Sequence, residues 1–315
     1  MTGAGTARGA GAPAGLARSA GGTGVRDSLR AFVTAARIGW RMEANWTDPI
    51  LFFIYSVAKP VSAAMILVVM LAVVGGPGSA ALQPFVVVGT AFWSLVTSGI
   101  SGLAWSILDD RERYRMLKYI FLSPSSFLVV LLGRGVARLG VGVAGALITI
   151  GIGVVFLGVP IDITRVNWPV LLVATVLGLA SVVAMALLLA AVCLQTRQES
   201  WSYPEAFAGA AFLLSGAVFP LSILPAPLQV VGLVTPLGWW IEAARRALLP
   251  GAPSGIGGAG SWLAGVANTT QPDLGWCLIA LIVTGAVATL AAALVFRFSV
   301  HRAQEKGLLD LTTGS

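Results

Sequence analysis

Six stretches of the chain are almost wholly apolar, and polar residues collect in the segments between them. A helix of about 20 apolar residues crosses a hydrocarbon layer of about 30 Å. We therefore predict transmembrane helices at Leu51–Val74, Phe85–Leu108, Val136–Leu157, Trp168–Leu194, Ala206–Phe219 and Leu274–Phe296. The fifth stretch is short for a crossing, whereas the other five are long enough. The pattern predicts an all-α polytopic membrane protein with six transmembrane helices.

A different pattern precedes the first of these stretches. Between Arg26 and Trp46 the apolar positions recur at helical spacing, at Leu29, Phe32, Val33, Ala36 and Trp40, and Arg30, Arg37 and Arg41 occupy another side. A basic amphipathic helix with tryptophan on its apolar side is typical of the membrane surface, so we expect an N-terminal interfacial helix. Residues 1–25 lack the apolar core of a secretory signal and are predicted to form a disordered cytoplasmic tail. Residues 301–315 are expected to form a cytoplasmic C-terminal tail.

Prolines interrupt the apolar sequence after the fifth stretch. Phe219 and Pro220 end that stretch, and Pro225 and Pro236 divide the segment that follows. Because proline removes a backbone donor and clashes with the preceding turn, a regular helix cannot continue through this segment. We predict that Pro220 to Leu249 form short re-entrant or interfacial helices on the external side and not a further crossing, with Phe219, Pro220 and Pro225 as candidate residues of an external re-entrant gate.

Composition and charge support a membrane protein and orient it. Of the 315 residues, 57% are hydrophobic and 10% are charged, against about 25% charged in soluble domains. Six spans place fourteen basic residues on one side of the membrane: Arg8, Arg18, Arg26, Arg30, Arg37, Arg41, Arg111, Arg113, Arg115, Lys118, Arg197, Arg297, Arg302 and Lys306. Arg165, Arg245 and Arg246 fall on the other side. Since basic residues gather in cytoplasmic loops, we expect a cell-membrane protein with both termini cytoplasmic, in contact with the lipid bilayer and not with nucleic acid.

The segment from Asp109 to Pro124 is the most charged part of the chain between two predicted spans. It is predicted to be an imperfectly amphipathic helix in which Tyr114, Leu117, Ile120 and Phe121 recur at helical spacing. Two interpretations stay open: a solvated loop helix, or a helix that docks on a soluble partner. Binding of magnesium by its three acidic residues is disfavoured, because no second acidic cluster accompanies them.

Ionisable residues inside apolar stretches are candidates for function because they are costly to insert into a membrane. Lys59, next to Pro60, could mark a substrate pathway or could extend its ammonium group to the inner interface. Arg134 and Arg138 are expected to anchor lipid headgroups near the inner end of the third span.

No catalytic machinery is evident from the sequence. His301 is the only histidine and lies in the predicted C-terminal tail, which leaves no nucleophile and base pair within the spans. None of the three lysines follows a glycine, so the phosphate-binding loop pattern is absent. We assign no catalytic, cofactor or metal residue to this chain and expect it not to be an enzyme. If ATP drives the protein, ATP and magnesium bind to a separate subunit.

In order and spacing, these features resemble the membrane-domain (permease) subunit of type-2 ATP-binding-cassette (ABC) exporters. The surface helix followed by Asp48-Pro49 is similar to that family's entry helix. Glu112–Pro124 with Leu132-Gly133-Arg134 is similar to its coupling segment. Ser215–Pro225, Thr235-Pro236-Leu237 and the E-x-x-R-x-x-L pattern from Glu242 are similar to its external re-entrant helices. Many members have Gly-Thr where this chain has Arg115-Met116, which is a departure within the coupling segment.

The resemblance implies a transmembrane domain over residues 26–300 and a dimer of cytoplasmic ABC ATPase subunits as partner. The residues expected to couple to the ATPase are Glu112, Tyr114, Leu117, Lys118, Phe121 and Pro124. A second permease subunit, identical or homologous, is also implied. The expected cargo is a hydrophobic drug, a lipid-like compound or a polysaccharide. An ion-coupled secondary transporter or a channel is the alternative.

Overall fold

The computed structural model describes residues 25–44, 49–76, 81–122, 126–196 and 202–305. The helices are α1 (Val25–Ala44), α2 (Pro49–Gly75), α3 (Gln83–Leu108), α4 (Leu117–Leu122), α5 (Phe127–Leu157), α6 (Trp168–Gln195), α7 (Ser202–Leu214), α8 (Ala226–Val234), α9 (Pro236–Leu248), α10 (Trp262–Ala267) and α11 (Leu274–Glu305). A π-helical turn, Asp109–Arg113, follows α3, and a 3-10 turn, Leu221–Ile223, precedes α8. No strand occurs in these ranges, and the predicted all-α membrane fold is confirmed.

Four helices are long and apolar enough to cross a membrane within the described ranges: α3 extended by the π turn, α5, α6 and α11. They correspond to the second, third, fourth and sixth predicted spans. The 27 residues of α2 cover the first predicted span. The 13 residues of α7 cover part of the fifth and extend over about 20 Å at 1.5 Å per residue. Six crossings therefore stay a prediction. Length and hydropathy do not establish that α2 and α7 cross the membrane.

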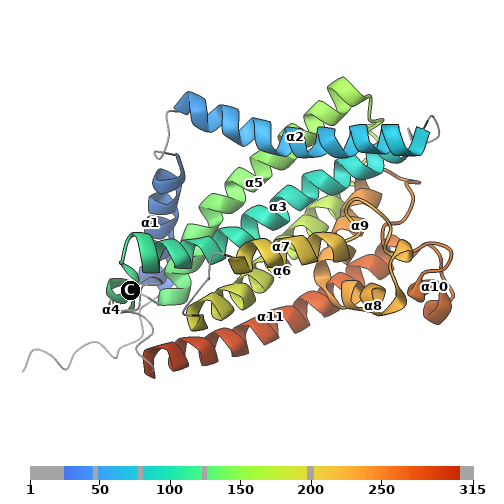
Figure 1. The fold of residues 1–315 in the computed structure, drawn as a ribbon. Coiled ribbons are helices and arrows are strands. Elements are labelled where there is room, and N and C mark those ends of the chain that lie inside the picture. Colours follow the sequence, from blue (N-terminus) through green and yellow to red (C-terminus); the bar gives the residue numbers. More distant parts are fainter. Residues whose placement is uncertain (1–24, 45–48, 77–80, 123–125, 197–201, 306–315) are drawn as a thin grey trace, which may run out of the picture.

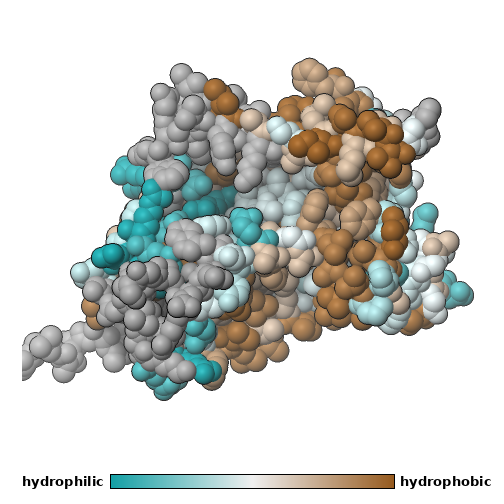
Figure 2. All heavy atoms as spheres, viewed as in Figure 1, coloured by the Kyte–Doolittle hydropathy of each residue, from teal (hydrophilic) through white to brown (hydrophobic). Residues whose placement is uncertain are grey.

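The long helices form a bundle around α3, which packs against α5 and α6 (Figure 1). α1 packs on α5, and α9 lies between α6 and α11. Helices α1 and α4 lie at one end of the bundle, and α8 and α10 lie at the other (Figure 1). Figure 2 shows hydrophilic residues gathered at the end that holds α1 and α4, and hydrophobic residues over the flanks. The bundle is thus polarised along its length.

Close backbone contact fixes α1 on α5. A Cβ atom added at Gly133 would lie 2.6 Å from the Phe32 carbonyl oxygen, and one added at Gly39 would lie 3.1 Å from the Arg134 Cα. Leu29 and Trp40, two residues of the predicted apolar face, remain exposed. The predicted apolar face is therefore divided between α5 and the surface, and the interfacial position of α1 stays a prediction.

The helices differ from the predicted ranges at three places. The segment from Asp109 is not one helix, because the π turn ends at Arg113 and Arg115 adopts a left-handed φ of 51° before α4. α5 begins at Phe127, before the predicted Val136, because the apolar pattern continues upstream through Arg134. α11 continues to Glu305, so the first residues of the predicted C-terminal tail are helical. The N-terminal tail, Pro124 and residues 306–315 lie outside the described residues, as do the side chains of Lys59, Lys118 and Phe121.

Candidate functional site

An ion-pair cluster joins the π turn to α1 and α5. Asp110 pairs with Arg134 of α5, and both residues are buried. Asp109 lies 3.2 Å from the Arg138 guanidinium, which also lies 3.5 Å from the Glu43 carboxylate of α1. Arg134 is buried against Asp110, so the expectation that Arg134 anchors a headgroup is wrong. The Arg138 side chain is 25% exposed, so a headgroup contact of Arg138 stays a prediction. We call Glu43, Asp109, Asp110, Arg134 and Arg138 the ion-pair cluster.

Arg111 joins the same turn to α6. Its Nη1 donates to the carbonyl oxygens of Cys193 at 3.1 Å and Thr196 at 3.0 Å, and its Nη2 lies 2.9 Å from Glu112. The last carbonyls of a helix have no partner within the helix and carry partial negative charge. A buried guanidinium therefore satisfies the end of α6, and Glu112 balances its charge. The turn after α3 is thus attached by side chains to α1, α5 and α6.

The residues predicted to couple to the ATPase differ in their exposure on and around α4. Leu117 is 1% exposed and packs in the chain's own core, so the expectation that it inserts into a partner is wrong. The left-handed conformation of Arg115 changes the helical phase and turns Leu117 inward. Tyr114 is half-buried beside Arg113. Among the side chains that the structure describes in α4 and its approach, the exposed apolar ones are Met116, Tyr119 and Leu122.

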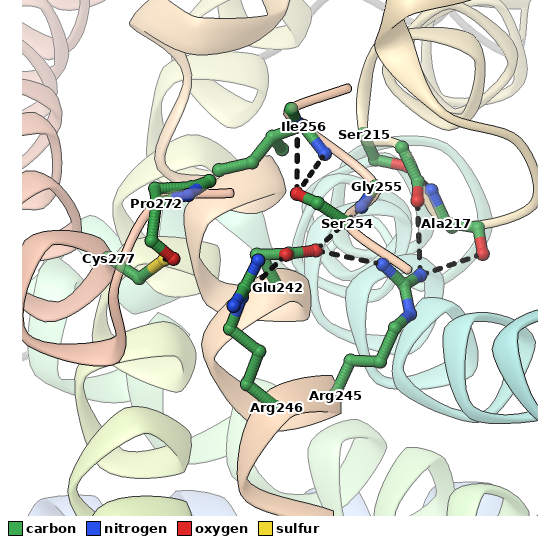
Figure 3. Close-up of polar contacts among 12 residues, drawn as sticks. Ser215, Ala217, Glu242, Arg245, Arg246, Ser254, Gly255, Ile256, Pro272 and Cys277 are labelled. Carbon is green, nitrogen blue, oxygen red and sulfur yellow. Dashed lines mark hydrogen bonds and ion pairs between the residues drawn. The ribbon is translucent and has the colours of Figure 1, made fainter. Parts of the chain in front are cut away.

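A second set of buried charges lies on α9 (Figure 3). Glu242 and Arg245 are each 1% exposed, and their side chains approach to 3.1 Å. Glu242 also lies 2.8 Å from Arg246 and accepts the Gly255 backbone N–H at 2.8 Å. Twelve of the 13 residues of α9 are buried, so the helix fills the space between α6 and α11 and does not lie on the surface. We call Glu242, Arg245 and Arg246 the α9 cluster.

The Arg245 guanidinium ties α9 to the turn after α7 and to the start of α3. Its Nη2 donates to the carbonyl oxygens of Gly216 and Ala217, each at 3.1 Å, and its Cζ lies 3.7 Å from the centroid of the Phe85 ring. Gly216 has φ +65°, which favours glycine. A Cβ atom at Gly89 of α3 would lie 1.7 Å from the Ala217 oxygen, so the turn fits only against a residue without a side chain.

The loop before α10 completes this assembly. The Ser254 hydroxyl accepts the Gly257 N–H at 2.9 Å, and the Gly255 carbonyl accepts the Leu221 N–H at 2.8 Å. Of the predicted gate residues, Phe219 and Pro220 are half-buried and Pro225 is exposed at the N-cap of α8. Residues 215–257 therefore form one body of short helices and turns held by the α9 cluster. The sequence shows this cluster only as Glu and Arg three positions apart in an apolar context, which is the signal that could have revealed a buried pair.

These features define an all-α, multi-pass membrane protein with buried ion pairs at both ends of its bundle. The family model described as ABC-2 type transporter matches residues 35–249, about two thirds of the chain. The chain belongs to this family and is the membrane permease component of an ABC transporter. The ion-pair cluster and the α9 cluster both lie within the matched residues. The chain matches no individual curated protein.

Proposed function

We propose that this permease works as an exporter that is driven by a dimer of separate cytoplasmic ATPase subunits, which bind ATP and magnesium. A second permease subunit would complete the path for a hydrophobic or lipid-like compound. In this arrangement, residues 109–124 contact the ATPase, and both termini are on the same side of the membrane as the ATPase. The ABC-2 family assignment supports a role in ABC transport, and the contacts of the π turn support the site of coupling.

The observation that carries the proposal is the attachment of one charged turn to three helices. Asp109 and Asp110 hold α1 and α5 through arginines, and Arg111 holds the end of α6. Loss of the partner in the buried Asp110–Arg134 pair would cost about 3–5 kcal/mol, so this contact resists separation. The contacts of Asp109 and Glu43 with Arg138 are partly exposed and contribute less. Force applied to the turn is therefore passed to α1, α5 and α6 and is not absorbed by a loose loop.

The exposed apolar residues next to the turn suit a protein contact. Leu122 is 80% exposed and Met116 is 37% exposed. Apolar side chains displayed on a short helix are typical anchors for a groove on a partner. In our proposal Lys118 and Phe121 belong to the same contact, and Leu117 supports α4 from inside.

At the other end of the bundle, the body of short helices would close the path. Phe219 and Pro220 follow the turn that Arg245 holds, so any opening of this body requires movement of that turn or of the whole body. α7 ends at Leu214, before Gly216 with its left-handed φ, and Pro220 prevents a regular helix from continuing through this segment. The gate is thus proposed to move as a unit hinged beside α7.

The coupling proposal is tested with Leu122→Asp in the full-length protein, purified with an affinity tag from its own cells. The wild type should co-purify with an ATPase subunit that carries a phosphate-binding loop, whereas the variant should lose that subunit because a carboxylate cannot enter an apolar groove. Val266→Asp on α10 is the matched control, since Val266 is 65% exposed at the opposite end of the bundle. Equal recovery of the ATPase with Leu122→Asp and Val266→Asp would refute docking through α4.

A further inference from the structure

A cavity of about 360 Å³ lies beside the ion-pair cluster, between the C-terminal end of α1, the end of α3 with the π turn, and α5. Glu43 and Asp109 supply carboxylates to its wall, and Arg113 and Arg138 supply guanidinium groups. Trp105 adds an aromatic surface. The cavity therefore combines both signs of charge with an aromatic wall in a volume of small-ligand size.

The charges that face this cavity are balanced. Arg134 also lines it, but Asp110 neutralises Arg134 from behind. Two carboxylates and two further guanidinium groups also face the cavity. Arg138 pairs with both carboxylates, and these three groups are partly accessible: side-chain exposure is 31% for Glu43, 25% for Arg138 and 17% for Asp109. A ligand with a single charge would be repelled by the two groups of like charge. A ligand with one positive and one negative charge could contact both the carboxylates and the guanidinium groups favourably.

The position of Glu43 favours a cation at one side of the cavity. Glu43 lies in the last turn of α1, where the helix dipole is negative and a basic residue is normally preferred. Its contact with Arg138, at 3.5 Å, is longer than the 3.2 Å contact between Arg138 and Asp109. Glu43 can therefore turn toward a ligand cation while Arg138 remains paired with Asp109.

The surroundings of the cavity indicate a lipid. Leu29, Val33 and Trp40 do not line the cavity but are exposed on α1, the helix whose C-terminal end does. An exposed apolar face beside basic residues is typical of a helix at the boundary of headgroups and acyl chains. Figure 2 shows that the bundle changes from hydrophilic to hydrophobic next to this end. A phosphate group fits the planar guanidinium forks, and an ammonium group fits the carboxylates and the tryptophan ring.

We propose that this cavity binds the zwitterionic headgroup of a membrane phospholipid. Its phosphate contacts Arg113 and Arg138, and its ammonium group contacts Glu43 and Asp109. Lipid binding at this site requires neither a nucleotide nor the ATPase. The lipid proposal and the coupling proposal can therefore be refuted separately.

Native mass spectrometry of the delipidated full-length protein tests this site, with dioleoyl phosphatidylethanolamine and dioleoyl phosphatidylglycerol titrated separately. The first lipid has both charges and the second has only the phosphate charge, and their acyl chains are identical. We expect tighter binding of phosphatidylethanolamine. Glu43→Gln should weaken its binding about tenfold, the effect of losing one charge-assisted hydrogen bond. The same change should not weaken phosphatidylglycerol binding, because it removes a carboxylate that repels the anionic lipid.

Asp27→Asn is the matched control, because Asp27 is an exposed carboxylate on the same helix and the change removes the same charge. It should bind both lipids as the wild type does. Met42→Trp provides a second test, since a larger side chain in the cavity wall should reduce binding without altering any charge. Equal affinity for the two lipids, or unchanged phosphatidylethanolamine binding in both Glu43→Gln and Met42→Trp, would overturn the proposal and indicate only non-specific lipid around the bundle.

Discussion

Replacement of Glu242 by glutamine should destabilise the protein more than any other single removal of charge at the α9 cluster. The carboxylate accepts from three donors: Arg245 at 3.1 Å, Arg246 at 2.8 Å and the Gly255 N–H at 2.8 Å. Glutamine has nearly the same shape but only one acceptor oxygen, and its amide group would face further donors. The change therefore leaves a buried guanidinium without a counter-charge.

The expected magnitude follows from burial. Glu242 and Arg245 are both 1% exposed, so water cannot take the place of the lost partner, and breaking such a pair costs about 3–5 kcal/mol. Arg246→Gln should cost less, about 1 kcal/mol, because the Arg246 side chain is 18% exposed and Glu242 keeps Arg245 and Gly255. Glu305→Gln should cost about 0–1 kcal/mol, since its pair with His301 is exposed to solvent.

The two buried cysteines provide the assay. Cys193 and Cys277 are the only cysteines of the chain and are both 0% exposed, so a thiol-reactive dye labels them only as the protein unfolds. In detergent, the unfolding midpoint of Glu242→Gln should fall by at least about 6 °C, at about 2–4 °C per kcal/mol. The order of midpoints should be Glu305→Gln, Arg246→Gln and then Glu242→Gln, from highest to lowest. Coincident midpoints for Glu242→Gln and Glu305→Gln would refute the argument.

Two further predictions address packing and topology. Gly89→Ala should lower the unfolding midpoint, because its Cβ would lie 1.7 Å from the Ala217 oxygen. Gly209→Ala is the control and should be neutral, because nothing lies within 4 Å of the added atom. Equal midpoints for the two variants would contradict the close contact at Gly89. In intact cells, an impermeant maleimide should label Thr270→Cys, in the loop before α11, but not Ser126→Cys, before α5. Labelling of Ser126→Cys would reverse the assigned orientation.

The apolar pattern was sufficient to predict the long helices. A continuous run of about 20 apolar residues is a strong and local signal in the sequence, so the bounds of α2 and α6 differ little from those expected. The proline-broken segment was also correctly predicted to form short helices, because the effect of proline on the backbone does not depend on the rest of the fold.

The ion pairs could not be predicted in the same way because their partners are far apart in sequence. The pairing of Asp110 with Arg134 depends on how α3 packs on α5, and no local pattern specifies this packing. Leu117 illustrates the same limit. Its helical spacing suggested an exposed apolar face, but one left-handed residue, Arg115, changed the direction of the chain and placed Leu117 in the core.

A single helix connects the two clusters. α3 contacts Arg245 and Ala217 through Phe85 and Gly89 near its start, and the π turn with Asp109 follows its end. Its 26 residues extend over about 39 Å, and α3 is the most buried of the long helices. An uninterrupted helix transmits an axial displacement without loss of backbone hydrogen bonds, so movement of the π turn must also move Phe85 and Gly89.

The contact at Gly89 then determines what kind of movement is possible at the far end. The Ala217 carbonyl fits only against Gly89, so sliding of α3 along the turn would bring a residue with a side chain against this carbonyl. The Arg245 guanidinium also stacks on Phe85 and bonds to Ala217. A displacement that preserves both Arg245 contacts carries the turn and α9 along with α3. One that breaks them removes the Phe85 contact and the bond to the Ala217 carbonyl from a buried guanidinium that keeps Glu242 as its counter-charge, and a hydrogen bond to a charged group contributes about 1.5–3 kcal/mol. Displacement of residues 215–257 as one body with α3 is therefore favoured over separation of that body from α3.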